Sequence, residues 1–119
     1  MEVRRGEVYT TNLIEKTTTG TEVGKKRPAV VVQADTWNED IQSTIVLPLS
    51  SVSPTYRGLD IVVLKKGEAN LDKDSIVLFP QIRSVDKSRL EKKVGSISEG
   101  KLKEIDQVLS LVLGLRPID

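Results

Sequence analysis

The segment AVVVQ at residues 29–33 is a continuous run of mostly β-branched side chains, without the alternation of a half-exposed strand. Such a run predicts a strand that is buried on both faces. The segment TIVLPL at residues 44–49 has the same character, and Pro48 within it indicates a strand end or a sheet edge. The two segments predict buried strands and place the chain in the mainly β class.

Shorter strand-like runs lie on both sides of these two, at residues 7–13, 59–64, 76–82 and 94–97. Short strands that are separated by turns, mostly with no helix between them, predict a small barrel or a compressed sandwich. Pro80 lies inside the run 76–82 and cannot donate to a strand ladder, so we expect a bulge or an exposed edge there.

Two segments have helical features. Residues 86–93 begin with the capping residue Asp86 and predict a turn or two of helix. After Ser98, six apolar residues recur at helical spacing up to Leu113, and Gly114 follows them. We therefore expect a C-terminal helix that begins after Ser98 and covers one end of the barrel.

Length and composition limit the possible functions. A chain of 119 residues is expected to form one domain, residues 1–119, and its formal charge of +1 does not by itself indicate a nucleic-acid partner. The chain contains no Cys and no His, which excludes disulfides, thiolate or imidazole metal sites, and catalysis by a Ser-His-Asp triad. No signal peptide or membrane-spanning run is found, so we expect a cytoplasmic protein.

A local cationic segment precedes the first buried strand. Lys25, Lys26 and Arg27 are adjacent, and Pro28 restricts Arg27 to an extended backbone. A guanidinium presents a planar fork of donors that suits a phosphate, particularly one that gains charge in a transition state. A solvated basic turn is the alternative interpretation.

Hydroxyl and carboxylate groups lie near this segment in the sequence. Ser50 and Ser51 end the second buried run, where they are either phosphate hydrogen-bonding groups or ordinary turn residues. Glu22 and Asp35 are the nearest carboxylates, and each is a candidate proton acceptor or an ion-pair partner of the basic segment. Trp37 is either an anchor for a partner or a packing residue.

A third candidate group follows from strand periodicity. Phe79, Gln81 and Arg83 share one face if residues 76–82 continue as a strand. An aromatic ring, an amide and a guanidinium on one surface suit base stacking, base-edge contacts and backbone binding in RNA. The alternative places Phe79 in the core, with two ordinary polar neighbours.

Taken in order, these segments resemble the MazF/PemK-type toxins of bacterial toxin–antitoxin modules over nearly the whole chain. The matching segments are RRGEVY (4–9), GKKRP (24–28) running into Val32 and Gln33, Asp35 and Asn38, TIV (44–46) before Ser50, KDS (73–75), QIRSVDKSRL (81–90) and LKEID (102–106). Each segment alone is a weak signal, whereas their common order is specific.

The resemblance implies an SH3-like barrel of the kind shared with CcdB toxins, usually a homodimer. It implies sequence-specific cleavage of single-stranded RNA without a metal or cofactor, by attack of the 2′-OH, and neutralisation by a cognate MazE-like antitoxin. The family's catalytic Arg corresponds to Arg27, its catalytic Ser or Thr to Ser50, and its upstream Glu to Glu22. Gln81 and Arg83 match the segment near the RNA path, where Pro80 departs from the usual Glu.

Lys25, Lys26, Ser51 and Phe79 complete the expected RNA-binding set. Residues 14–26 and 56–58 are expected to line a groove in which RNA and an acidic antitoxin tail compete. Two alternatives use the same barrel: a CcdB-like toxin that binds and poisons DNA gyrase, and an RNA-binding protein without catalysis.

Overall fold

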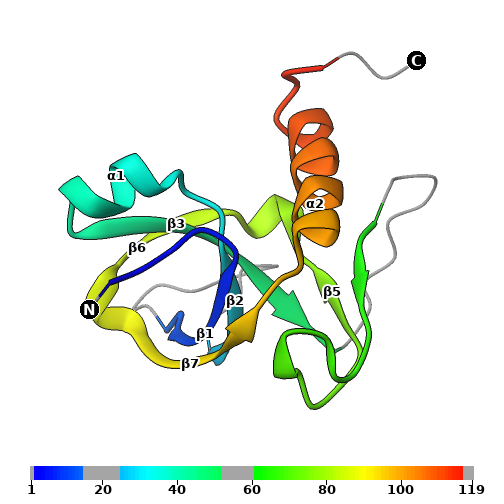
Figure 1. Ribbon diagram of the computed structural model, residues 1–119, viewed down its shortest axis with the longest axis horizontal. Helices are drawn as coiled ribbons and strands as arrows, with labels where there is room; N and C mark the ends of the chain where they lie inside the picture. Colours follow the sequence, from blue (N-terminus) through cyan, green and yellow to red (C-terminus); the bar gives the residue numbers. More distant parts are fainter. Residues whose placement is uncertain (1, 15–24, 52–60, 117–119) are drawn as a thin grey trace.

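The computed structural model describes residues 2–14, 25–51 and 61–116, which form a curled, seven-stranded antiparallel sheet with a helix at its side (Figure 1). The strands are β1 (Glu7–Asn12), β2 (Lys26–Val31), β3 (Ser43–Ser50), β4 (Val63–Leu64), β5 (Ser75–Val77), β6 (Arg83–Asp86) and β7 (Leu90–Ser96). Their order in the sheet is β4-β5-β3-β2-β1-β7, and β6 also pairs with β3. The prediction of a mainly β, barrel-like fold with a C-terminal helix is confirmed.

The continuous apolar run at residues 29–33 lies at the centre of the sheet and is buried on both faces, as predicted. Ala29, Val30 and Val31 are all 0% exposed. Val30 belongs to one hydrophobic cluster, whereas Ala29 and Val31 belong to a second one. Because successive side chains of a strand point to opposite faces, β2 supplies apolar side chains to both clusters.

Pro48 does not end its strand, contrary to one of the two expectations. β3 pairs with β2 over residues 46–48 and with β5 over residues 49–50. On the other side from β2, β3 pairs first with β6 over residues 43–46 and then with β5. Pro48 lies between these two ladders, and its carbonyl oxygen accepts a hydrogen bond of 2.9 Å from the Leu78 N–H. The missing proline N–H is accommodated because one ladder is ending there.

The two ends of the sheet, β4 and β7, meet through a short 3₁₀ turn, η1 (Glu68–Asn70). Asn70 donates a side-chain hydrogen bond of 3.1 Å to the Val94 carbonyl oxygen. A Cβ atom at Gly95 would lie 2.4 Å from the Ala69 carbonyl oxygen, so only glycine allows this approach. Ala69 and Asn70 adopt left-handed conformations with φ of 51° and 59°. The half-barrel is thus closed by backbone packing at Gly95.

The C-terminal helix α2 (Glu99–Val112) begins where the sequence predicts. The Ser98 hydroxyl accepts a hydrogen bond of 3.2 Å from the Lys101 N–H and caps the helix. Ile105 and Val108 are buried in the core, and Arg5 forms an ion pair with Asp106. Only part of the helix covers the barrel, because its C-terminal half projects away from the sheet (Figure 1). None of the helices among the described residues is long and apolar enough to cross a membrane.

Two local predictions are confirmed only in part, and a third extends beyond the described residues. Residues 86–93 form one 3₁₀ turn, η3 (Lys87–Arg89), which Asp86 caps as predicted, but the strand β7 follows it, because pairing with β1 outweighs the local helical preference. The run 76–82 is divided into β5 and a 3₁₀ turn, η2 (Phe79–Gln81), with Pro80 in its first turn. Residues 59 and 60 of the expected strand 59–64 lie outside the described ranges, and β4 forms within the described part.

A short helix, α1 (Asp35–Asp40), was not predicted. Its buried side chain is Asn38, which accepts hydrogen bonds from Gln33 (2.9 Å) and Thr44 (2.7 Å) and donates one to the Gln33 carbonyl oxygen (2.9 Å). All three side chains are less than a tenth exposed. Residues that carry part of the family resemblance therefore form a buried polar network that joins β2, α1 and β3.

Candidate active site

A cavity of about 290 Å³ lies where β2 begins and β3 ends. Its lining comes from three segments: Lys25, Lys26, Arg27 and Pro28; Leu49, Ser50 and Ser51; and Leu71, Asp72, Lys73 and Ser75. The structure thus brings Arg27 and Ser50 to one cavity, together with the neighbouring cations and Ser51.

The pairing of β2 with β3 explains this juxtaposition. The ladder places Ala29 opposite Pro48. Arg27 and Ser50 each lie two residues beyond this last pair, on the same side of it, and both belong to the strands. Two residues 23 positions apart in sequence therefore face one anion-sized space.

The Arg27 side chain is partly buried, and its Nε atom is fully buried with no hydrogen-bond partner among the residues that the structure describes. Burial also lowers the pKa of its guanidinium below the usual value, although an arginine side chain remains charged at neutral pH. A buried donor without a partner costs about 1–3 kcal/mol. Arg27 also lines the cavity, so an anion there would balance the charge of its guanidinium.

The charges around the cavity are mostly positive. Lys25, Lys26, Arg27 and Lys73 contribute four cations, and Asp72 is the one carboxylate among the described lining residues. Lys26 forms an ion pair of 3.2 Å with Glu91, but both side chains are more than a third exposed, so the pair contributes little. The arrangement suits a phosphate group.

The shared strand face predicted for Phe79, Gln81 and Arg83 is wrong, and the alternative that places Phe79 in the core is confirmed. These residues span the turn η2 and the start of β6, so strand alternation does not apply to them. Phe79 is 3% exposed and belongs to the core, which leaves its ring unavailable for stacking on a base. Gln81 and Arg83 are half-buried and do not line the cavity; Arg83 donates a hydrogen bond of 3.3 Å to the Leu13 carbonyl oxygen.

The structure describes one of the two candidate carboxylates, Asp35, and not the other, Glu22. Glu22 lies outside the described residues, as do residues 56–58 and most of the segment 14–26. Asp35 accepts hydrogen bonds from the Arg5 backbone N–H (2.7 Å) and from Asn38 (3.2 Å), and the Arg5 bond is the main reason why its pKa is lowered. Asp35 therefore anchors α1 and does not pair with the basic segment. Trp37, on the same helix, is 62% exposed.

The sequence interpretation assigned no role to the third wall of the cavity, residues 71–75. Its segment KDS was noticed only as part of the family resemblance. Asp74 fixes this turn, because its Oδ1 atom accepts a hydrogen bond of 2.7 Å from the Lys66 N–H. Lys73 and Asp72 are thus the cavity residues that sequence reasoning missed.

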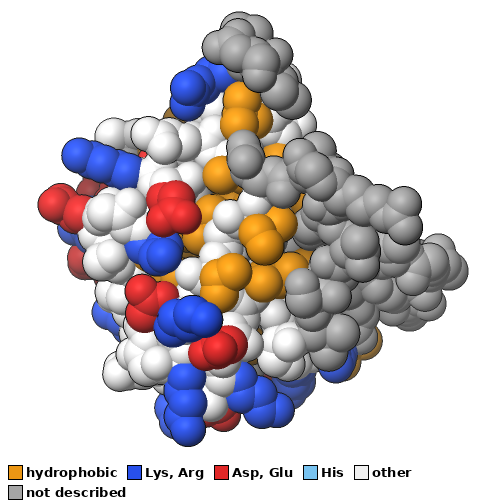
Figure 2. Space-filling view, turned by 90° about the vertical axis from the view of Figure 1, so that its right-hand side faces the viewer, with side chains coloured by type: hydrophobic (Ala, Val, Ile, Leu, Met, Phe, Trp, Pro, Cys, Tyr) orange, Lys and Arg blue, Asp and Glu red, His pale blue; other side chains and the backbone are white. Residues whose placement is uncertain are grey.

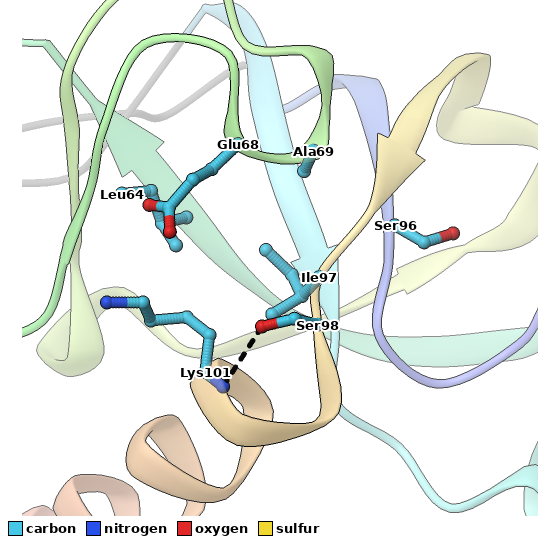
Figure 3. Close-up of a pocket in the computed structure, with 7 residues that line it drawn as sticks. All are labelled: Leu64, Glu68, Ala69, Ser96, Ile97, Ser98 and Lys101. Atoms are coloured by element: carbon cyan, nitrogen blue, oxygen red, sulfur yellow. Dashed lines mark hydrogen bonds between the residues drawn. The ribbon is translucent and has the colours of Figure 1, made fainter.

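A second cavity, of about 190 Å³, lies between η1 and the start of α2 (Figure 3). Its polar groups are already engaged: Ser98 caps α2, Glu68 accepts a hydrogen bond of 2.7 Å from the Lys65 N–H, and Lys101 donates one of 3.3 Å to the Val63 carbonyl oxygen. The cavity at Arg27 is therefore the better candidate for an active site.

The chain is similar to known proteins over almost all of its length. A family model described as "PemK-like, MazF-like toxin of type II toxin-antitoxin system" matches residues 4–113. A protein named Endoribonuclease MazF, from Staphylococcus epidermidis, is 38% identical over 117 residues, which cover 98% of this chain and 96% of that relative.

Solved structures agree with this similarity. A crystal structure of MazF from Deinococcus radiodurans superposes with a TM-score of 0.76 at 25% identity, covering 96% of this chain and 98% of the other. An endoribonuclease in complex with its cognate antitoxin, from a mycobacterial species, has the same fold, with a TM-score of 0.74 at 18% identity and coverage of 98% and 99%. The chain therefore belongs to the PemK-like, MazF-like toxin family of type II toxin–antitoxin systems.

Proposed function

We propose that this chain is a metal-independent endoribonuclease toxin that cleaves single-stranded RNA at short, specific sequences in the cytoplasm. The observation that carries the proposal is the cationic cavity that is lined by both Arg27 and Ser50. Membership of the toxin family and 38% identity to a protein named as an endoribonuclease support RNA cleavage as the activity.

The proposed chemistry suits a chain without His or Cys, because RNA carries its own nucleophile. The 2′ oxygen forms a bond to the adjacent phosphorus, and the bond from phosphorus to the 5′ oxygen breaks. The products are a 2′,3′-cyclic phosphate and a 5′-OH end. The protein has to orient the attack in line, transfer protons and stabilise the charge of the pentavalent intermediate.

The lining residues divide these tasks in the proposal. The Arg27 guanidinium binds the phosphoryl oxygens, a contribution of about 10²–10³ in rate if it acts as one oxyanion-hole donor does. The Ser50 hydroxyl binds a second oxygen or orients the nucleophile, and Lys25, Lys26 and Ser51 bind the flanking backbone. Glu22 is the proposed general base, and Gln81 and Arg83 contact the RNA farther along its path.

A comparison of RNA with its deoxy counterpart tests this function. Purified protein in EDTA is incubated with a single-stranded RNA library and with its all-deoxy counterpart. The proposal predicts cleavage of RNA alone, with 5′-OH ends. Equal cleavage of the deoxy strand would contradict the 2′-OH mechanism, and binding without cleavage would indicate the RNA-binding alternative. The gyrase-poisoning alternative is not favoured, because the relatives are endoribonucleases.

The proposal includes two protein partners. A cognate antitoxin with an acidic segment would compete with RNA for the cationic cavity. A second copy of the chain is the other partner, and apolar surface supports it: hydrophobic side chains gather on the face shown in Figure 2, and Val112, Leu113 and Leu115 near the end of α2 are 45%, 49% and 74% exposed. Light scattering that shows a monomer at micromolar concentration would contradict the dimer.

A further inference from the structure

We propose that Lys73 positions the RNA substrate by binding the backbone phosphate next to the one that is cleaved. This inference rests on the proposed function and adds a residue to which neither the family resemblance nor the comparisons assign a role. It begins from the third wall of the cavity, where Lys73 faces the same space as Arg27 and Ser50.

The sheet order separates the two cations. β3 lies between β2 and β5, and Ser50 pairs with Ile76 of β5. Arg27 is on the β2 side of Ser50, whereas Lys73 precedes β5 on the other side. Two strand spacings amount to about 10 Å between the backbones of β2 and β5, which leaves room for two neighbouring phosphates of one RNA strand. A chain that crosses Ser50 would meet Arg27 first and Lys73 next, or the reverse.

The backbone around Lys73 is held on both sides. Before it, Leu71 is 4% exposed and its carbonyl oxygen accepts a hydrogen bond of 2.8 Å from the Gly67 N–H. After it, Asp74 binds the Lys66 N–H at 2.7 Å and forms an ion pair of 3.8 Å with Lys65. A cation on such a fixed turn binds an anion with little loss of backbone entropy.

The Lys73 side chain does not stabilise the fold through an ion pair with any described residue. It is exposed and forms no ion pair with the residues that the structure describes. Its neighbour Asp72 also lines the cavity, is exposed and opposes anion binding. Among the described residues no ion-pair partner engages the ammonium group, so it can bind a phosphate, and neutralising Asp72 should strengthen that binding.

The test compares Lys73→Met with Lys103→Met, a control that removes an exposed cation of α2 outside the cavity lining. Binding is measured from 0.05 to 0.5 M salt with an RNA whose scissile nucleotide is 2′-deoxy. Each phosphate contact of a single strand contributes about 0.7 to the salt slope of log K. We expect Lys73→Met to lower this slope by about 0.7, which corresponds to about four-fold weaker binding at 0.15 M salt.

Kinetics on the cleavable RNA should show the same loss of binding. KM is expected to rise about four-fold in Lys73→Met with kcat within two-fold of the wild type, and Lys73→Arg should restore KM. Asp72→Asn should lower KM. A salt slope and KM equal to those of Lys103→Met would overturn the proposal, as would a loss confined to kcat. If the wild type binds RNA without cutting it and Lys73→Met still lowers the slope, the proposed function fails and the Lys73 contact stands.

Discussion

Replacement of Arg27 by methionine should separate activity from stability, because no described residue accepts a hydrogen bond from its buried Nε atom. Burial also lowers the pKa of the Arg27 guanidinium. Keeping the guanidinium in place thus costs the native state about 1–3 kcal/mol. Methionine is similarly long and unbranched, and it leaves no buried donor. We expect Arg27→Met to leave the free energy of unfolding unchanged or to raise it by about 1–2 kcal/mol.

Activity should change in the opposite direction. Loss of one donor to a developing phosphorane is expected to lower kcat/KM by about 10²–10³, or about 2.7–4 kcal/mol of transition-state stabilisation. Initial rates on a single-site RNA measure this loss, and urea unfolding followed by circular dichroism measures stability. Such a trade between stability and activity is typical of functional sites.

Arg89→Met is the matched control for this variant. Arg89 is also half-buried, but its Nη1 atom donates hydrogen bonds to the carbonyl oxygens of Asn12 (3.1 Å) and Ile14 (3.0 Å). Its replacement should therefore lower the free energy of unfolding by about 1–3 kcal/mol. If Arg27→Met is destabilised as much as Arg89→Met, Arg27 is a structural residue and the reasoning is refuted.

Two further predictions concern the fold. Gly95→Ala would place a Cβ atom 2.4 Å from the Ala69 carbonyl oxygen, and we expect it to lower the free energy of unfolding in urea by about 1–3 kcal/mol. Gly100→Ala is the control, because its Cβ atom would meet no atom within 4 Å, and it should not destabilise the protein. Equal effects of the two variants would contradict the closure at η1. Burial, together with a hydrogen bond to Glu7, raises the pKa of Tyr9 to about 12. The folded state therefore holds this proton more tightly than the unfolded state, whose tyrosines titrate near 10. Stability should be complete below pH 10 and fall by about 1–3 kcal/mol between pH 10 and 12; a Tyr9→Phe variant with the same pH dependence would contradict this assignment.

The parts of the fold that the sequence predicted are those with strong hydrophobic patterns. The apolar run 29–33 predicts a doubly buried strand, and helical spacing after Ser98 predicts α2 with its cap. Both signals coincide with burial in the structure, where Val30 and Ile105 are 0% exposed. Burial of apolar side chains decides these elements, so the pattern alone is sufficient to find them.

The elements that sequence analysis missed depend on tertiary contacts. α1 exposes Trp37 and buries Asn38, the reverse of the usual hydrophobic pattern, because Asn38 bonds to Gln33 and Thr44. Residues 90–93 carry three charged side chains and still form a strand, since β1 provides their hydrogen-bond partners. Neither outcome is visible in a local window of sequence.

The candidate site likewise combines residues that the sequence predicts with residues that only tertiary contacts bring together. Arg27 precedes one of the two runs that the sequence marks as strands and Ser50 follows the other, so their juxtaposition follows once β2 and β3 pair antiparallel. Lys73 comes from a turn 23 residues beyond Ser50, and only the pairing of β3 with β5 brings it to the cavity. Phe79 was misplaced because strand periodicity was applied across the 3₁₀ turn at Pro80.

The central claim is that the ribose attacks its own phosphodiester in the cavity at Arg27 and Ser50. The most direct measurement first maps one cleavage position by sequencing 5′-OH ends, and then uses an RNA in which only the nucleotide 5′ to that position is 2′-deoxy. The account predicts that this strand remains uncut at the mapped position, while a strand with the same substitution one nucleotide farther away is still cut there. Cleavage of the first strand at the mapped position would contradict the account.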